Sequence, residues 1–377
     1  MTLKEALSKH FWSAFHKPFK PIIERAMPIL INLNSSSITV SMSKRFFLWQ
    51  MIHNMARTIE NDPHLNFVSV LKSYKVLDRV LHGEIEEFYR DRNKFYFKNF
   101  FVDDRLWNLV KKDIEWVYKK NKSVQMTITK NGIIVYHNYN KNNFNILLLT
   151  IHSGTWMPED IQKKQAISER KRFMEEDIDT HKIYGNLVLE KGGIWIDSKF
   201  SRFACDFNRA PERCILENDA HNKVRQVWKE ELTSFQRKRL NKIYAEFYFT
   251  LGHLIDSYRF NIIFDGHSMR DAKGRPDISF GTRYIPNFYM PIVKSMHRKL
   301  CKEGYNHVAF NNPYGGGSIL KWLNKRFTDI FIFSMEVNKK LYMSRDRKKT
   351  VQKRLDKLSV NITKIFDIEE EPDERTS

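Results

Sequence analysis

A largely apolar run at residues 144–151, FNILLLTI, constrains the fold of this chain more than any other segment. It is apolar on both faces of a strand, which is typical of a strand buried between two layers of helices. Similar runs recur downstream, at residues 193–197, 261–264, 307–311 and 331–337. Helical patterns lie between or beside them, at residues 158–175, 177–185, 232–258, 289–302 and 347–366. This alternation predicts an α/β fold of three layers, α/β/α, around a central mixed, mainly parallel sheet.

The sequence divides into three parts. Residues 1–122 predict a mostly helical region, with amphipathic patterns at 3–16, 43–59 and 68–88, and with a loop and a short strand at 34–42. Strand signals begin at residue 123, where Asn131-Gly132 predicts a hairpin between strands at 124–129 and 133–137. Residues 123–366 therefore form the predicted catalytic domain. Residues 367–377 are acidic and predict a disordered tail.

The net charge of +20 favours an acidic partner, which could be nucleic acid, an anionic membrane surface or an anionic small substrate. The basic residues are scattered and no nucleic-acid motif is present, so a solvated basic surface is the simpler interpretation. Residues 95–118 interleave aromatic and basic side chains, which favours the core of a helical subdomain over stacking on single-stranded nucleic acid.

The sequence shows three cysteines in no metal-binding pattern, and it begins without the apolar core of a signal peptide. No run approaches the roughly 18–20 apolar residues that cross a bilayer. We therefore expect a soluble, cytoplasmic protein without a transmembrane segment. The sequence leaves its oligomeric state open.

Two of the predicted strands lead directly into a histidine. His152 follows the run at 144–151, and His267 follows the run at 261–264 with Asp265 two residues before it. Strand ends meet at one edge of an open α/β sheet, where ligands bind. Two imidazoles and a carboxylate form a zinc site with an open position for water, and such water can attack an amide carbonyl. Asp265 has the placement of a carboxylate that orients a ligating histidine. Taken alone, His152 would equally suit a histidine of the buried core, and His267 would equally suit a surface histidine at a strand end.

The third ligand of such a site is left open by spacing. The candidate carboxylates downstream of His152 are Glu159, Asp160, Glu175, Glu176, Asp177 and Asp179.

Three further segments carry polar groups suited to a substrate. In FACDFNRAPER, residues 203–213, Asp206, Asn208 and Arg209 are too polar for core, and Arg209 could bind a carboxylate through two parallel hydrogen bonds, although a surface ion pair is the simpler alternative. Glu336 stands in the apolar strand 331–337, where burial would raise its pKa toward that of a general base. The glycines 315–317 allow a ligand to approach the backbone, but they lack the pattern of a nucleotide-binding loop.

Together these segments resemble the N-formylglutamate amidohydrolase family, whose fold belongs with the zinc-dependent carboxypeptidases (zinc exopeptidase-like). The matching strings occur in the order of the family: IHSG (151–154), EEDID and THKIY (175–184), RFACDFNRAPE (202–212), FDGHSM (264–269), RPDISFGT (275–282), NNPYGGG (311–317) and MEVNKKLYM (335–343). The resemblance covers roughly residues 144–345. It has no counterpart for the N-terminal 120 or so residues.

The resemblance implies a role for each motif. His152 and His267 would bind Zn²⁺, with Asp177 as the preferred third ligand and Glu176 as the alternative. The carboxypeptidases proper have a glutamate three residues after the first histidine, and Thr155 stands there instead. Asp265 and Ser268 would support the ligands, and Glu336 would be the general acid/base. The remaining implied residues polarise the scissile carbonyl, bind the substrate or line its pocket: Arg202, Asp206, Asn208, Arg209, Gly315, Gly316 and Gly317.

The sequence thus predicts a zinc-dependent amidohydrolase that acts on an N-formyl or N-acyl amino acid, or on a peptide, with a free carboxylate. A metallo-carboxypeptidase-type peptidase acting on γ-glutamyl or peptidyl C-termini is the first alternative. The second is a basic protein that binds nucleic acid or a membrane surface and carries an inactive hydrolase domain. The +20 charge supports this second alternative, and the complete set of polar residues argues against it.

Overall fold

One continuous β-sheet organises the part of the chain that the computed structural model describes, namely residues 29–32, 39–42, 104–129, 131–138, 145–218 and 226–367. The strand order is β2-β1-β3-β4-β6-β5-β7-β10-β8-β9. The strands are β1 (Ile29–Asn32), β2 (Thr39–Met42), β3 (Gln125–Ile128), β4 (Ile133–Asn138), β5 (Ile146–Thr150), β6 (Gly193–Ser198), β7 (Ile262–Met269), β8 (Ile278–Gly281), β9 (Val308–Phe310) and β10 (Phe331–Asn338).

The sheet is mixed, as the sequence predicts. Its four central strands, β6, β5, β7 and β10, are mutually parallel, while β4 and β3 on one side and β8 on the other join antiparallel. Strands β5, β7 and β10 are buried along their whole length, which explains the apolar runs at residues 146–149, 262–264 and 331–333. The predicted hairpin is present, because β3 and β4 pair across a turn in which Gly132 has a φ of +78°.

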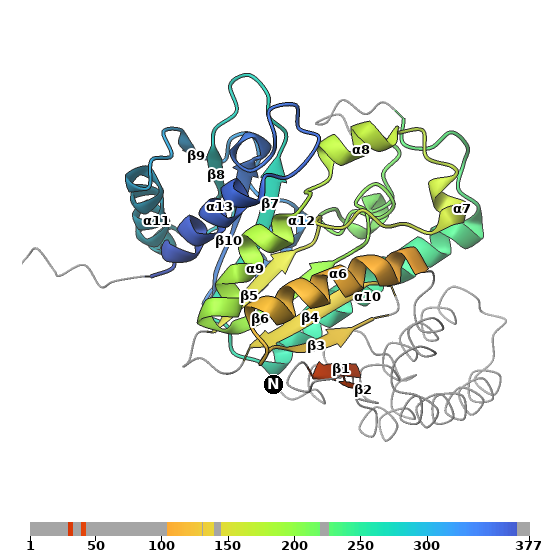
Figure 1. Cartoon of the computed structure of the whole chain (residues 1–377), viewed down its shortest axis with the longest axis horizontal. Helices are drawn as coiled ribbons and strands as arrows, with labels where there is room; N and C mark the ends of the chain where they lie inside the picture. The colour runs from red at the N-terminus through yellow and green to blue at the C-terminus, as the bar shows by residue number, and fades with distance from the viewer. Residues whose placement is uncertain are drawn as a thin grey trace, which may run out of the picture.

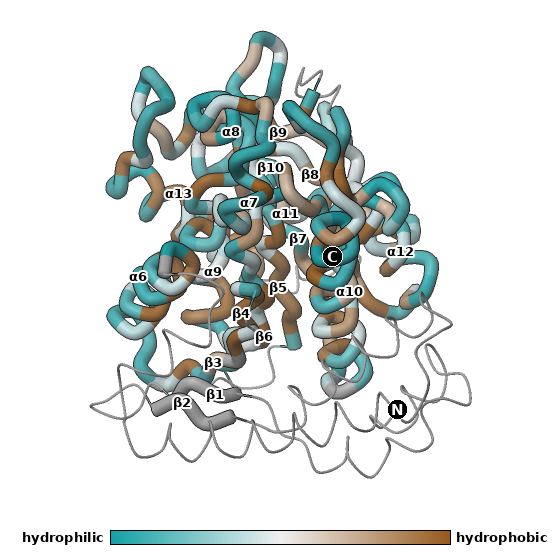
Figure 2. The backbone as a smooth tube through the Cα atoms, turned by 90° about the vertical axis from the view of Figure 1, so that its right-hand side faces the viewer, coloured by the Kyte–Doolittle hydropathy of each residue, from teal (hydrophilic) through white to brown (hydrophobic). Residues whose placement is uncertain are grey.

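Helices cover both faces of the sheet. They are α6 (Asp104–Lys120), α7 (Glu159–Gln162), α8 (Glu169–Glu175), α9 (Thr180–Lys191), α10 (Ser234–Ser257), α11 (Met290–Lys302), α12 (Ser318–Arg326) and α13 (Gln352–Lys364). Helices α6, α9 and α13 lie on one face, and α10 and α12 lie on the other (Figures 1 and 2). The predicted three-layer α/β/α architecture is therefore confirmed. Among the described helices, none has the length and hydropathy needed to cross a bilayer.

The helix predicted at 158–175 is wrong, because two short helices, α7 and α8, occupy this segment. The residues between them bond to a distant loop instead of continuing the helix: the Ala166 amide donates to the Val227 carbonyl, and the Lys229 amide donates to the Lys164 carbonyl. Ser168 then caps α8 by accepting a hydrogen bond from the Lys171 amide.

Two predicted boundaries near the candidate site also differ. The strand predicted to end at Phe264 continues to Met269, because β10 pairs with it along all eight residues. The helix predicted to start at Asp177 begins at Thr180, because Asp179 has a φ of 58° and interrupts it. Strand β8 and helix α12 were not predicted at all.

Helix α6 is the one described helix of the predicted N-terminal region. Its buried side chains Leu106, Val110, Ile114 and Val117 belong to the same hydrophobic core as the central strands. The helical patterns predicted at 3–16, 43–59 and 68–88 lie outside the described residues, as do the aromatic segment 95–103 and the tail 368–377. The domain boundary at residue 122 stays a prediction. Helix α6 precedes this boundary in the sequence, but it packs into the core of the domain that follows it.

Candidate metal centre

His152 lies in the turn that follows β5. It is buried, with 2% of its surface exposed. The turn is anchored on the neighbouring strand β6, because the side chains of Thr150 and Ser153 both donate to Asp197 Oδ1. Gly154 permits the tight approach to β6, since a Cβ atom at this position would overlap the Lys199 backbone.

His267 lies within β7 and not beyond its end. In the parallel pair β7–β10 it is directly opposite Glu336, so the sheet register places the two side chains beside each other. Tyr184 donates from its hydroxyl to the His267 carbonyl at 2.8 Å and to the Met335 carbonyl at 3.1 Å, which ties α9 to both strands. His267 and Glu336 therefore stand on two buried central strands that pair over eight residues.

Asp177 lies in the short segment between the end of α8 at Glu175 and the start of α9 at Thr180. Its amide donates to the His152 carbonyl at 3.2 Å. The residues on either side of Asp177 are held by two side chains that follow β10. Lys339 Nζ donates to the Glu176 carbonyl at 2.5 Å, and the Tyr342 hydroxyl donates to the Ile178 carbonyl at 2.9 Å. The ligand segment is thus fixed on both sides of Asp177.

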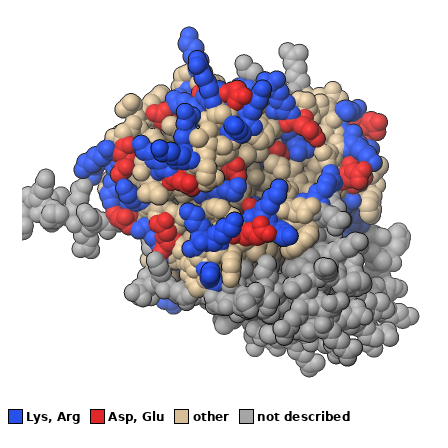
Figure 3. Space-filling model, in the orientation of Figure 1, with Lys and Arg blue, Asp and Glu red and all other residues tan. Residues whose placement is uncertain are grey.

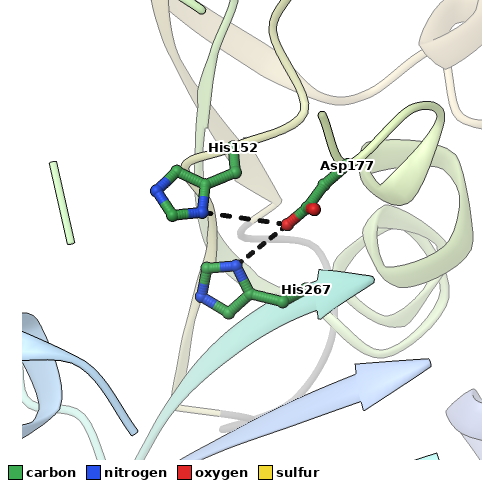
Figure 4. A group of neighbouring side chains, drawn as sticks. All are labelled: His152, Asp177 and His267. Atoms are coloured by element: carbon green, nitrogen blue, oxygen red, sulfur yellow. Dashed lines mark hydrogen bonds and ion pairs between the residues drawn. The ribbon is translucent and has the colours of Figure 1, made fainter. Parts of the chain in front are cut away.

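These three residues converge (Figure 4). Asp177 Oδ2 lies 3.0 Å from His267 Nδ1 and 3.8 Å from His152 Nδ1. One ligand atom from each residue can be chosen so that all three lie within 4.8 Å of one another. His152 Nδ1 is buried and has no hydrogen-bond partner, although buried ring nitrogens are normally paired. The triad therefore offers three converging donor atoms, one of which lacks a partner.

A carboxylate backs each of the two imidazoles. Asp206 Oδ1 lies 2.7 Å from His152 Nε2, and Asp265 Oδ2 lies 2.8 Å from His267 Nε2. Metal-binding histidines usually have this arrangement, in which the second ring nitrogen meets a carboxylate that fixes the orientation of the ring. Both rings therefore present Nδ1 to the centre of the triad.

The electrostatics of the site also favour a cation. Burial lowers the pKa of His267, but Asp265 and Asp177 outweigh it and raise this pKa well above its usual value. Burial lowers the pKa of His152, while Asp206 partly opposes this shift. Two imidazoles and a carboxylate are a donor set that suits zinc. The residues present therefore fit the metal that the sequence predicts.

Glu336 is buried beside the triad. Burial and the charge of Asp177 raise its pKa to about 7, while His267 acts in the opposite direction. A carboxyl group with a pKa close to neutrality can both accept and release a proton, which is the property of a general acid/base.

Asp206 has a different position from the one that the sequence suggests. It is fully buried, and its carboxylate meets His152, the Arg202 guanidinium at 2.9 Å and the Asn208 amide at 2.9 Å. Burial would raise its pKa, but Arg202 and His152 hold that pKa well below its usual range. That Asp206 contacts the substrate stays a prediction, and its contacts in the structure also suit a residue that orients His152.

Glu176 points away from the triad. Its carboxylate accepts from the Ser201 hydroxyl and lies 3.1 Å from Arg172 Nε. Of the two acids considered for the third ligand, the structure brings Asp177 to the histidines and keeps Glu176 out. Ser268 Oγ lies 3.4 Å from Asp177 Oδ1, on the side of the carboxylate that does not face the histidines.

The predicted substrate-binding residues lie together beside the triad. Arg209 Nε is 3.6 Å from Asp206 Oδ2, and its side chain is one-third exposed. Asn208 accepts from the Ile319 amide at 3.3 Å and so joins the start of α12. Gly317 is needed there, since a Cβ atom would overlap the Asn208 amide. Gly315 packs against Arg283, and Gly316 has a φ of +108°.

Lys339 and Asp197 were not predicted, although both lie one contact away from a triad segment. Lys339 follows Glu336 by three residues in the matching string MEVNKKLYM, but only the fold shows that its ammonium is buried. Asp197 lies near the end of the apolar strand β6, and an acid in that position was the only feature of the sequence that could have indicated its role.

Lys and Arg side chains are spread over the molecular face shown in Figure 3, and Asp and Glu side chains lie among them. The high net charge is therefore not collected into one continuous patch on the described part of this face. This distribution does not favour the nucleic-acid alternative.

Three comparisons with known proteins bear on this site. A model of the N-formylglutamate amidohydrolase family matches residues 144–343, which is more than half of the chain. No curated protein matches the sequence. Among solved structures, an N-formylglutamate amidohydrolase from Ralstonia eutropha JMP134 is similar with a TM-score of 0.52 and 19% identity, over 62% of this chain and 95% of that one. A gene product from Agrobacterium tumefaciens has a TM-score of 0.49 and 15% identity, over 62% of this chain and 92% of that one.

Proposed function

This chain belongs to the N-formylglutamate amidohydrolase family, and from that premise we propose that it is a zinc-dependent enzyme that hydrolyses the amide bond of an N-acyl amino acid with a free carboxylate. One observation carries the proposal. His152, Asp177 and His267 converge in a buried cluster in which His152 Nδ1 has no hydrogen-bond partner. Such a cluster is costly to bury unless a cation completes it.

His152, Asp177 and His267 would hold the zinc. When bound there, zinc would act as a Lewis acid on the amide carbonyl and would make water a stronger acid. Asp206 and Asp265 keep the two rings turned so that Nδ1 faces the centre. The protein's contribution at this point is to fix the direction of the ligands and to exclude bulk water from them.

Glu336 would carry the proton. Its pKa of about 7 allows the carboxylate to take a proton from the attacking water and to return it to the departing amine. The C–N bond breaks, the water oxygen remains on the acyl carbon, and the proton leaves with the amine. Because Glu336 is opposite His267 in the sheet register, the proton carrier stays next to the ligand set throughout.

Arg209 would bind the free carboxylate of the substrate, with Asn208 beside it. Arg209 is held near Asp206 yet remains one-third exposed, so its guanidinium can reach a ligand from solvent. Arg202 is anchored on Asp206 and is the candidate to polarise the scissile carbonyl. N-formyl-glutamate, other N-acyl amino acids, γ-glutamyl amides and peptide C-termini all present an amide with a nearby carboxylate.

Zinc content measured by plasma emission tests the metal. We expect about one zinc per wild-type chain and a loss of zinc in His267→Ala, with His297→Ala as the control, because His297 lies on α11 and bonds to the Val308 carbonyl. A wild-type protein purified without chelators that contains no metal would contradict the proposal. A second assay compares the rates of amine release from the four substrate types named above, and the fastest one identifies the preferred acyl group.

A further inference from the structure

A buried cluster of charges lies behind the metal centre. It comprises Asp113 on α6, Asp197 and Lys199 at the end of β6, and His181 in the first turn of α9. Each of the four side chains exposes 6% of its surface or less. Clusters of this kind contribute little to net stability, because the desolvation of the charges offsets their attraction. A role other than stability is therefore of interest.

Asp113 uses both of its carboxylate oxygens. Oδ2 forms an ion pair with Lys199 Nζ, and Oδ1 lies 3.0 Å from His181 Nε2. Burial would raise the pKa of Asp113, but His181 and Lys199 hold it well below its usual range, so the carboxylate is charged. Asp113 is thus the only cluster member that joins α9 to the end of β6 within the described residues.

From Lys199 the cluster continues to the turn that carries His152. Lys199 Nζ also pairs with Asp197, whose other carboxylate oxygen accepts from Thr150 and Ser153, on either side of the His152 turn. The Lys199 carbonyl accepts from the Trp156 amide at 2.9 Å, which closes the same turn against β6.

His181 joins the cluster to the segment that carries Asp177. It lies four residues after Asp177 in the first turn of α9, just past the left-handed Asp179 that precedes this helix. The ring of Trp116, one turn after Asp113 on α6, meets the His181 ring edge to face at 6.3 Å and so holds it in place. Two of the three triad segments are therefore connected through one carboxylate.

That carboxylate belongs to a helix outside the family match, which covers residues 144–343. We propose that Asp113 is a positioning residue of the metal centre, through which α6 holds the His152 turn and the start of α9 at the spacing that the zinc ligands require. This inference rests on the zinc site of the proposed function.

The test is zinc affinity, measured by competition with a chelator on the full chain. Asp113→Asn keeps the size of the side chain but removes its charge, so it weakens the contacts of residue 113 with Lys199 and His181 while Lys199 retains Asp197. We expect zinc to bind roughly tenfold more weakly, as is typical when a group behind a metal ligand is changed. Val110→Ala is the matched control, because it destabilises the same helix only through lost apolar contacts.

Weaker zinc binding in Asp113→Asn than in a Val110→Ala variant of equal or lower thermal stability supports the positioning role. Equal zinc affinity in Asp113→Asn and the wild type overturns it. If Asp113→Asn does not fold, the double variant Asp113→Leu/Lys199→Met, which removes one charge of each sign, is judged by the same comparison. Absence of zinc from the wild type would instead contradict the proposed function.

Discussion

Lys339 places its ammonium group 2.5 Å from the carbonyl oxygen of Glu176, the residue directly before Asp177. The same ammonium donates to the Met174 carbonyl at 2.7 Å. A buried lysine thus donates to two main-chain carbonyls in the segment that carries Asp177, the proposed third zinc ligand. This lysine directly follows β10, the strand that carries Glu336.

Lys339→Met is expected to damage this segment. Each unpaired buried carbonyl costs about 1–3 kcal/mol, and Asp177 loses a neighbouring positive charge. We expect a lower free energy of unfolding and zinc affinity reduced roughly tenfold to a hundredfold. The adjacent Lys340→Met removes an ion pair with Asp277 at the surface and is the control. Equal zinc affinity in the two variants would show that Lys339 does not position Asp177.

Glu336→Gln is expected to separate proton transfer from metal binding. The amide has nearly the shape of the carboxyl group but cannot exchange a proton, so kcat should fall by about 10²–10⁴-fold. Zinc content should stay at the wild-type level, because Glu336 is not one of the three converging ligands. Single-turnover kinetics with metal analysis on the same preparation measure both. Retention of more than a tenth of the wild-type kcat would remove Glu336 from the proposed mechanism.

Gly317→Ala is expected to raise KM. The new methyl group would overlap the side-chain amide of Asn208. That side chain must then move and lose its hydrogen bond from the Ile319 amide at the start of α12. A rise in KM of roughly tenfold with a smaller change in kcat would follow if Asn208 and Arg209 bind the substrate carboxylate. Gly252→Ala is the matched control, because nothing lies within 4 Å of that position in α10. An unchanged KM would place the substrate carboxylate elsewhere.

His137 is expected to make the protein less stable in acid. Burial, with a contribution from His253, lowers its pKa from 6.5 to about 4. Between these two values the unfolded chain binds a proton that the folded protein does not, so the free energy of unfolding falls as the pH decreases from 6.5 to 4. The loss would be about 3 kcal/mol for this shift.

Urea unfolding of the wild type and His137→Gln at pH 7 and pH 4 measures this effect, because glutamine does not titrate. The stability difference between the two proteins should shrink, or reverse in favour of the variant, on going to pH 4. Parallel losses in both proteins would assign the acid sensitivity to other groups.

The histidines of the site could be predicted because each follows an apolar run, and runs that are apolar on both faces form neighbouring parallel strands. Strands β5 and β7 do pair in parallel, which brings His152 and His267 together. Glu336 could be predicted because it is an acid within an apolar strand. The apolar runs made these three residues candidates, and the family resemblance assigned their roles.

The choice between Glu176 and Asp177 needed the fold. Both are buried acids in adjacent positions, and their side chains differ only in which distant groups they meet: Arg172 and Ser201 for one, the two histidines for the other. The interruption of the helix predicted at 158–175 had the same origin, since its bonds go to residues more than 60 positions away. Such distant hydrogen-bond partners cannot be identified from the local sequence.

Strand pairing separates the two tasks of the site. His267 and Glu336 stand opposite each other on paired strands, where a one-residue slip would turn either side chain to the other face of the sheet. Arg209 and Gly317 lie in connecting segments outside any strand. The proposed metal ligand and proton carrier are therefore tied to the strand register, while the residues proposed to bind the substrate carboxylate lie in segments where a substitution leaves that register unchanged.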